Sequence, residues 1–245
     1  MRIKLTIQYD GTAYCGWQRQ KNGVSLQETI ENAVEKLCGK KVCVTGSGRT
    51  DSGVHAKGQV AHFDFDGNIP PEKFYLALNT LLPDDVKILS SRQVDESFHS
   101  RFSAKRKTYV YRFYVSEVVL PLKDRYAVKI SAMPDIKAMR RAAKAFCGEH
   151  DFAAFRGTGS EVKDTVRTIY GLFVDETDGG LEISVTGNGF LYNMVRVMAG
   201  TLLAAGYGEL TGTDVEKALS SGKRDKLFKT MPAKGLTLES VEYDI

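Results

Sequence analysis

The sequence predicts an α+β protein built from two similar α/β halves, residues 1–115 and 116–245, each with mixed or antiparallel strands. Apolar and polar residues alternate over 3–9 and in other short segments, which is typical of half-buried strands. Apolar residues recur at helical spacing after Ser25 and after Asp135. Both halves place strands around a helix, so we interpret them as a weak internal duplication.

The first half follows from local signals. A strand over 3–9 leads into a polar and aromatic loop over 10–20. Ser25 and Glu28 form a capping box that opens a helix, and Gly39 ends it. The remaining elements are expected to be strands at 42–45, 59–65 and 86–94, with a helix between Pro70 and Pro83.

The second half begins after an irregular stretch over 116–133, and its elements show the same kinds of signal. The expected order is a helix from Pro134 to Gly148, strands over 165–174 and 181–186, a long helix that opens over 187–196 and is capped by Gly206, a short helix with a capping box at Thr213–Glu216, and a final strand ending near Tyr243.

Composition narrows the class of protein. The apolar and charged fractions are those of an ordinary globular protein, and a net charge of +4 is too small by itself to establish an anionic partner. The four cysteines include no C-x-x-C pair, so their spacing is poor for zinc. We find neither a signal peptide nor an apolar run long enough to span a bilayer. We therefore expect a cytoplasmic protein with reduced cysteines, no metal and no membrane contact.

The strongest functional signal lies at 42–65. Between its two predicted strands are four glycines, with Arg49 and Asp51 two residues apart at the centre. Glycine permits tight turns and the close approach of a ligand. A guanidinium facing the same cleft would keep the carboxylate ionised and orient it, as a nucleophilic or acid–base carboxylate requires. The alternative is a glycine-rich turn with a surface Arg–Asp pair.

Two common glycine motifs do not fit this loop. A phosphate-binding loop has the spacing of Gly48 and Gly53 but needs a lysine where Val54 stands. A dinucleotide fingerprint needs a third glycine where Asp51 stands. The tripeptide Asp-Ser-Gly at 51–53 matches aspartic proteases, which need two such aspartates. A dimeric protease with one aspartate from each chain therefore stays an alternative.

The most basic stretch lies at 98–112. It contains five lysines or arginines, four aromatic residues and no acid. Cations neutralise phosphates and aromatic rings stack on unpaired bases, so this composition favours RNA as a partner. The alternative is an exposed basic edge strand whose tyrosines pack inward.

The string Gly-Ser-Gly-Arg-Thr-Asp-Ser-Gly-Val-His-Ala at 46–56 resembles the active-site motif of the TruA family of tRNA pseudouridine synthases. Further segments resemble that family in the same order, at 9–20, 98–104, 187–196 and 230–236, so the resemblance covers essentially the whole chain. It implies the pseudouridine synthase fold, with both halves joined across a central RNA-binding cleft. It also implies an isomerase that converts uridine to pseudouridine at positions 38, 39 and 40 of the tRNA anticodon stem-loop, without cofactor or metal, as a homodimer.

The resemblance implies roles for residues at matching positions. Asp51 is the implied nucleophile, which would attack C1′ or C6 or remove a sugar proton. Arg49 and Arg196 are implied active-site arginines able to pair with it. Tyr109 would stack on the target uracil and is a candidate proton carrier, and Leu236 would line the uracil pocket. The other implied tRNA-binding residues are Phe98, His99, Ser100, Arg101, Phe102, Lys105, Arg106 and Arg156.

Two positions and two alternatives qualify this interpretation. Ser100 stands where the family usually has alanine, a mild departure, and His55 is more readily interpreted as a structural hydrogen-bonding residue. A synthase of the same fold with a shifted RNA target would keep every motif, because loops read RNA shape. A non-catalytic RNA-binding protein of this fold is a further alternative, which the intact Arg-Thr-Asp core disfavours.

Overall fold

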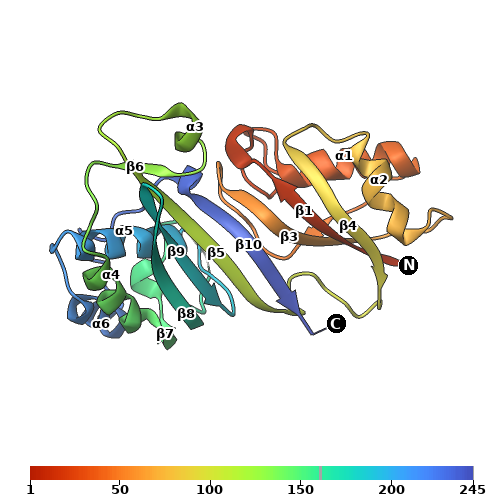
Figure 1. The fold of residues 1–245 in the computed structure, drawn as a ribbon. Coiled ribbons are helices and arrows are strands. Elements are labelled where there is room, and N and C mark those ends of the chain that lie inside the picture. Colours follow the sequence, from red (N-terminus) through yellow and green to blue (C-terminus); the bar gives the residue numbers. More distant parts are fainter. Residues whose placement is uncertain (160–161, 245) are drawn as a thin grey trace. The chain divides into compact units, whose positions relative to one another are not determined.

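The computed structural model describes residues 1–159 and 162–244, and the chain forms two compact units (Figure 1). Unit 1 comprises Met1–Lys105 and Thr237–Ile245, and unit 2 comprises Arg106–Leu236. Each unit contains a sheet with helices, so the predicted α+β class is confirmed. The predicted functional division near residue 115 stays a prediction.

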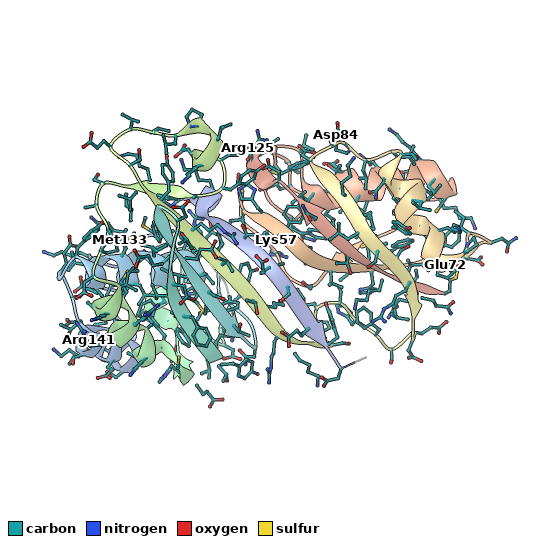
Figure 2. The ribbon with its side chains drawn as sticks, viewed as in Figure 1. Lys57, Glu72, Asp84, Arg125, Met133 and Arg141 are labelled. Atoms are coloured by element: carbon teal, nitrogen blue, oxygen red, sulfur yellow. The ribbon has the colours of Figure 1, made fainter. Side chains whose placement is uncertain are left out.

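The sheet of unit 1 depends on pairings between distant parts of the chain. Its strands lie in the order β4, β1, β3, β10. Strand β1 pairs antiparallel with both β3 and β4, whereas β10 pairs parallel with β3 through Thr237 and Leu238. Lys57 of β3, which is labelled in Figure 2, forms an ion pair with Glu239 of β10 at 2.8 Å. The strands are β1 (Arg2–Tyr9), β3 (His55–Asp64), β4 (Val86–Val94), β10 (Leu236–Tyr243) and the short β2 (Thr45–Gly46), which pairs with β3.

Two helices pack on the sheet of unit 1. Helix α1 (Leu26–Cys38) begins at Ser25, whose side chain accepts a hydrogen bond from the N–H of Glu28 at 3.2 Å. It ends at Gly39, which has a left-handed φ of 69°. Helix α2 (Phe74–Asn79) follows the 3-10 turn η2 (Pro71–Lys73) and packs its first residue edge-on against Phe63 and Phe65. The predicted cap at Ser25 and the predicted end at Gly39 are confirmed.

The predicted strand at 42–45 is wrong in its bounds, because β2 comprises only Thr45–Gly46. Val44 is buried, and side chains of helix α1 form hydrogen bonds with its backbone N–H and carbonyl groups. Its N–H donates to Oε1 of Glu31 at 3.0 Å, and its carbonyl accepts from Nε2 of Gln27 at 3.1 Å. Polar side chains of a helix therefore replace the neighbouring strand that the alternating pattern suggested.

In unit 2 the strands lie in the order β5, β9, β8, β7, with β6 paired parallel to β5. The three longer helices cover one face of this sheet (Figure 1). Strands are β5 (Ala104–Val115), β6 (Val128–Ile130), β7 (Gly148–Asp151), β8 (Val166–Thr177) and β9 (Gly180–Gly187). The helices of unit 2 are α3 (Pro121–Asp124), α4 (Ile136–Ala143), α5 (Met194–Gly206) and α6 (Gly212–Ser221). Unit 2 also contains the 3-10 turns Lys144–Phe146, Ala153–Phe155 and Ala233–Gly235, and unit 1 contains the 3-10 turn Gly11–Ala13.

Four predictions in unit 2 are wrong in detail. The helix expected from Pro134 to Gly148 comprises only Ile136–Ala143, and the 3-10 turn Lys144–Phe146 follows it. The capping box of α6 uses Thr211, whose N–H donates to Asp214 at 2.9 Å, rather than Thr213. Helix α5 begins at Met194 because Asn193 has a positive φ of 59°, which is incompatible with an earlier helical turn. The stretch expected to be irregular contains α3 and β6. Within the described residues, no helix is long and apolar enough to cross a membrane.

We predict that Ser25→Ala lowers the free energy of unfolding by about 1 kcal/mol, because it removes the only side-chain cap of α1 among the described residues. Urea denaturation measures this change. Ser90→Ala is the matched control, since this serine lies exposed on β4. Equal losses in both variants would contradict the assignment of Ser25 as the cap.

Candidate active site

The residues predicted from the sequence belong to both units. Arg49 and Asp51 lie between β2 and β3, in what we call the Asp51 loop (residues 47–54). Residues 98–105 follow β4, also in unit 1. The others belong to unit 2: Arg106 and Tyr109 on β5, Arg156 after a 3-10 turn, Arg196 on α5 and Leu236 at the start of β10.

The Asp51 loop is anchored to the Trp17 loop, which comprises residues 9–17. The N–H of Trp17 donates to the carbonyl oxygen of Thr50 at 3.0 Å. Oγ of Ser52 donates to the carbonyl oxygen of Tyr14 at 3.2 Å. Both chain neighbours of Asp51 are therefore bonded to the same partner loop, which restricts where its half-buried side chain can point.

Buried side chains strengthen this contact. The hydroxyl groups of Tyr9 and Thr50 lie 2.8 Å apart, and burial raises the pKa of Tyr9 to about 12, so its hydroxyl stays protonated. Nδ1 of His55 accepts from the N–H of Gly11 at 3.0 Å and lies 3.1 Å from Oδ1 of Asp10. His55 is buried and joins the two loops, in agreement with the structural role expected for it.

Glycines allow the two loops to lie this close. A Cβ at Gly11 would stand 2.0 Å from the carbonyl oxygen of Val54. A Cβ at Gly16, whose φ is +108°, would stand 2.6 Å from the carbonyl oxygen of Thr50. The two backbones are thus in contact, and no larger residue fits at either position unless they separate. The Trp17 loop stands out in the sequence only as a segment that matches the family, because its contacts join residues about forty positions apart.

Arg49 lies beside Asp51 in sequence, but its side chain is directed elsewhere. It is exposed, and its Nε donates to Oε1 of Gln18 at 3.2 Å. It forms no ion pair in the part of the chain that the structure describes. The expected effect of Arg49 on the carboxylate stays a prediction.

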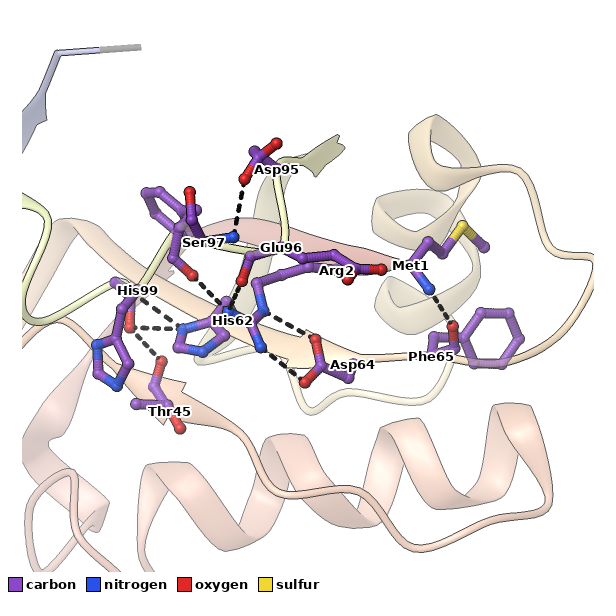
Figure 3. Close-up of polar contacts among 12 residues, drawn as sticks. Met1, Arg2, Thr45, His62, Asp64, Phe65, Asp95, Glu96, Ser97 and His99 are labelled. Atoms are coloured by element: carbon purple, nitrogen blue, oxygen red, sulfur yellow. Dashed lines mark hydrogen bonds and ion pairs between the residues drawn. The ribbon is translucent and has the colours of Figure 1, made fainter.

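Arg2 fixes the backbone that enters the basic stretch. Its guanidinium donates twice to Asp64 at 2.8 Å, and this pair lowers the pKa of that carboxyl below its usual value (Figure 3). The same guanidinium donates to the carbonyl oxygens of Glu96 and Phe98. The segment leading to residues 98–105 is therefore tied to the first strand of the sheet.

Part of the basic stretch is structural. Ser100 is fully buried, and its hydroxyl lies 2.7 Å from the carbonyl oxygen of Thr45 and 2.9 Å from Nδ1 of His62. The serine that replaces the family's alanine therefore holds the stretch to β2 and β3. Phe98 is also buried, with its ring 5.0 Å from that of Tyr243.

Three other side chains of this stretch are accessible to a partner. Arg101, Phe102 and Lys105 are exposed, and Phe102 has 77% of its surface accessible. The ring of His99 lies against that of Phe102 with 4.3 Å between centroids, and Arg101 lies 5.7 Å from the same ring. An exposed aromatic ring flanked by a cation suits an unpaired base.

Unit 2 brings three predicted motifs together. Tyr109 is buried with its ring edge-on to Phe190, 5.2 Å between centroids. Arg196 is held by two acceptors, the carbonyl oxygen of Met231 at 2.7 Å and Oδ1 of Asn193 at 2.6 Å. The Pro-Ala-Lys-Gly-Leu segment at 232–236 packs on β5, where Tyr111 donates to the carbonyl oxygen of Pro232 at 2.6 Å.

Two predicted arginines of unit 2 have other contacts. Arg106 lies over the ring of Tyr170, 5.0 Å from its centroid. Arg156 donates from Nη1 to the carbonyl oxygen of Val162 at 2.6 Å. Their part in binding RNA stays a prediction. The described residues contain no group of three or more His, Cys, Asp or Glu side chains suited to a metal ion.

Comparison with known proteins identifies the family. A family model described as tRNA pseudouridine synthase matches residues 5–103 and 142–244. The tRNA pseudouridine synthase A of Ruminiclostridium cellulolyticum is 48% identical over 99% of each chain. The tRNA pseudouridine synthase A of Clostridium acetobutylicum is 46% identical over 98% of this chain and 99% of its own length. That of Bacillus subtilis is 45% identical over 100% of each chain.

This chain belongs to the tRNA pseudouridine synthase family, and it is an isomerase with the fold of that family. The resemblance inferred from the sequence motifs is confirmed.

We predict that Gly16→Ala lowers the rate of pseudouridine formation roughly tenfold to a hundredfold, because its Cβ would displace Thr50 and with it Asp51. Single-turnover assays on a tRNA transcript measure the rate. Gly39→Ala is the matched control: φ is +69° there and nothing lies within 4 Å of the added Cβ. That variant should lose stability from left-handed strain but keep the rate. Equal rates in both variants would show that the two loops are not coupled.

Proposed function

We propose that this isomerase converts uridine to pseudouridine at positions 38, 39 and 40 in the anticodon stem-loop of tRNA, with Asp51 as the nucleophile. The observation that carries the proposal is the anchoring of Asp51, whose two chain neighbours are both bonded to the Trp17 loop. A carboxylate on a fixed backbone is positioned before substrate arrives, so less entropy is lost on reaching the transition state.

The reaction is an isomerisation, so its atoms balance within the nucleotide. The N1–C1′ glycosidic bond breaks, the uracil rotates, and C5 bonds to C1′ while the hydrogen on C5 moves to N1. The carboxylate of Asp51 attacks C1′ or C6, or removes a sugar proton, and must be ionised to do so. Arg49 and Arg196 are the proposed active-site arginines, since a nearby cation favours the ionised form.

The target uridine must leave the base stack first, which costs a few kcal/mol. Stacking of the extruded uracil on Tyr109, together with apolar contact from Leu236, offsets this cost in our proposal. The phenol of Tyr109 is also the proposed proton carrier. Arg196 has a fixed guanidinium, because Met231 and Asn193 hold it.

Exposed cations of both units bind the body of the substrate in this proposal. Arg101, Phe102 and Lys105 of unit 1 are accessible. Phe98 and Ser100 are buried and hold this segment against the sheet. His99, Arg106 and Arg156 complete the proposed tRNA-binding set. We further propose that the enzyme acts as a homodimer with one tRNA crossing both subunits. A shifted RNA target is the alternative, and it would leave every one of these residues in place.

We predict that Asp51→Asn abolishes pseudouridine formation but leaves tRNA affinity within a few-fold of wild type, because the carboxamide keeps the shape and loses the nucleophile. Single-turnover kinetics and filter binding on the same unmodified transcript measure the two quantities. Asp66→Asn, an exposed aspartate after β3, is the control for the loss of one negative charge. Loss of binding in step with activity would contradict the nucleophile assignment.

We predict that Tyr109→Phe keeps tRNA affinity and lowers the rate of pseudouridine formation, since stacking needs the ring and proton transfer needs the hydroxyl. The control is Tyr75→Phe on α2, which removes a hydroxyl far from β5 in sequence. The measurement is a single-turnover rate at saturating enzyme. An unchanged rate would rule out the hydroxyl as a required proton carrier.

A further inference from the structure

A cluster of buried polar side chains packs against the Asp51 loop within unit 1. Its members are Tyr9 of β1, Ser47 and Thr50 of the loop, and Gln59 of β3, and each exposes 6% of its surface or less. Burying a polar group is costly unless it is hydrogen-bonded, and apolar groups of the same shape can be as stable or more so. The cluster therefore indicates a requirement for defined geometry at this place.

Gln59 uses both ends of its amide to hold the start of the loop. Its Oε1 accepts hydrogen bonds from Oγ of Ser47 at 2.7 Å and from the N–H of Val60 at 3.1 Å. Its Nε2 donates to the carbonyl oxygen of Gly48 at 3.1 Å. Because Val60 needs an acceptor and Gly48 needs a donor, one orientation of the amide satisfies both. The first two residues of the loop are thereby bonded to one buried side chain.

The same amide also acts on the residue that precedes Asp51. Burial raises the pKa of Tyr9, and contacts of its hydroxyl with Thr50 and Gln59 oppose that rise. The hydroxyl groups of Tyr9 and Thr50 lie 2.8 Å apart. Gln59 thus contacts the loop directly at its start and, through Tyr9, next to Asp51.

We propose that Gln59 is a positioning residue for the nucleophile, because its amide sets where the Asp51 loop starts and therefore where Asp51 lies. The inference rests on the proposed function, since it takes Asp51 as the nucleophile. Gln59 is fully buried and does not reach the substrate, so it acts on the rate and not on tRNA affinity. A displacement of about 1 Å at a reacting group can lower a rate about a hundredfold.

The variant Gln59→Glu separates geometry from stability, because its hydrogen bonding changes with pH. The protonated carboxyl has one donor and one acceptor end, so it can replace the amide. The ionised carboxylate has acceptors alone, and one of its oxygens faces the carbonyl oxygen of Gly48, which displaces the loop. Burial raises the pKa of a carboxyl into or above the neutral range, so both forms are accessible in an assay.

The tyrosines that face this cluster do not titrate in the range of the test. Burial raises the pKa of Tyr9 of β1 to about 12, and burial also raises the pKa of Tyr243 of β10, whose hydroxyl contacts Ser47. Wild type and variant share Asp51, so the rate of Gln59→Glu is divided by the wild-type rate at each pH. This ratio should be high at low pH and fall as pH rises through the pKa of the introduced carboxyl.

Trp17 provides a spectroscopic signal from the loop itself. It is the only tryptophan in the sequence, and its side chain is buried. A Cβ at Gly46 would stand 2.5 Å from Cε2 of the Trp17 ring, so this ring packs against the backbone that enters the Asp51 loop. A displaced loop changes the surroundings of the ring and therefore its fluorescence.

The test measures the single-turnover rate, the Kd for an unmodified tRNA transcript and the Trp17 fluorescence. Gln59→Met should lower the rate roughly tenfold to a hundredfold, shift the fluorescence and leave the Kd within a few-fold of wild type. Gln59→Glu should show the same loss at about pH 8.5 and recover most of the wild-type rate at about pH 6. Asn79→Ala is the matched control, because that amide bonds the N–H and carbonyl of Ile88 on β4 at 2.8 and 2.9 Å. It should lose stability but keep the rate and the fluorescence.

An unchanged rate in Gln59→Met, an equal loss in Asn79→Ala, or tRNA affinity that falls in step with the rate overturns the inference. If Gln59→Met does not fold, Gln59→Glu at low pH decides, because its protonated carboxyl keeps the bonds and a rate that stays low overturns the inference. Full activity in the Gln59 variants with an inactive Asp51→Asn overturns this inference alone. An active Asp51→Asn overturns the proposed function and this inference together.

Discussion

The contact of Thr50 with the Trp17 loop is the constraint on which the rest of the site depends. Its carbonyl accepts from the N–H of Trp17, and its hydroxyl meets that of the buried Tyr9. Two glycines bring the backbones into contact, so the position of Asp51 follows from packing within unit 1. A polar loop without this partner would sample many conformations, and its carboxylate would have to be ordered at each turnover.

The basic stretch at 98–105 contains both supporting residues and exposed residues. Phe98 and Ser100 are buried and bonded to the sheet, and through them the exposed Arg101 and Phe102 are presented to solvent. Residues that one family motif groups together therefore do different things: some build the support and others meet the partner.

Local signals predicted the local structure well. The cap at Ser25 and the strand over 86–94 both appear as expected, because neighbours in sequence determine them. Val44 shows where such signals fail: it alternates like a strand residue, but side chains of α1 bond its backbone. The motif at 46–56 led to the family, yet no pattern could show that Arg92 and Tyr243 share a pocket, because sheet pairing of distant strands brings them together.

The most direct test of this account is a map of pseudouridine by carbodiimide modification and primer extension, on unmodified tRNA transcripts incubated with wild type or Asp51→Ala. We expect pseudouridine at positions 38 to 40 with wild type and none with the variant. Modification at another position would contradict the proposed substrate site. Equal modification by the variant would contradict the proposed role of Asp51. It would also contradict our interpretation that the contact with the Trp17 loop serves to position this residue.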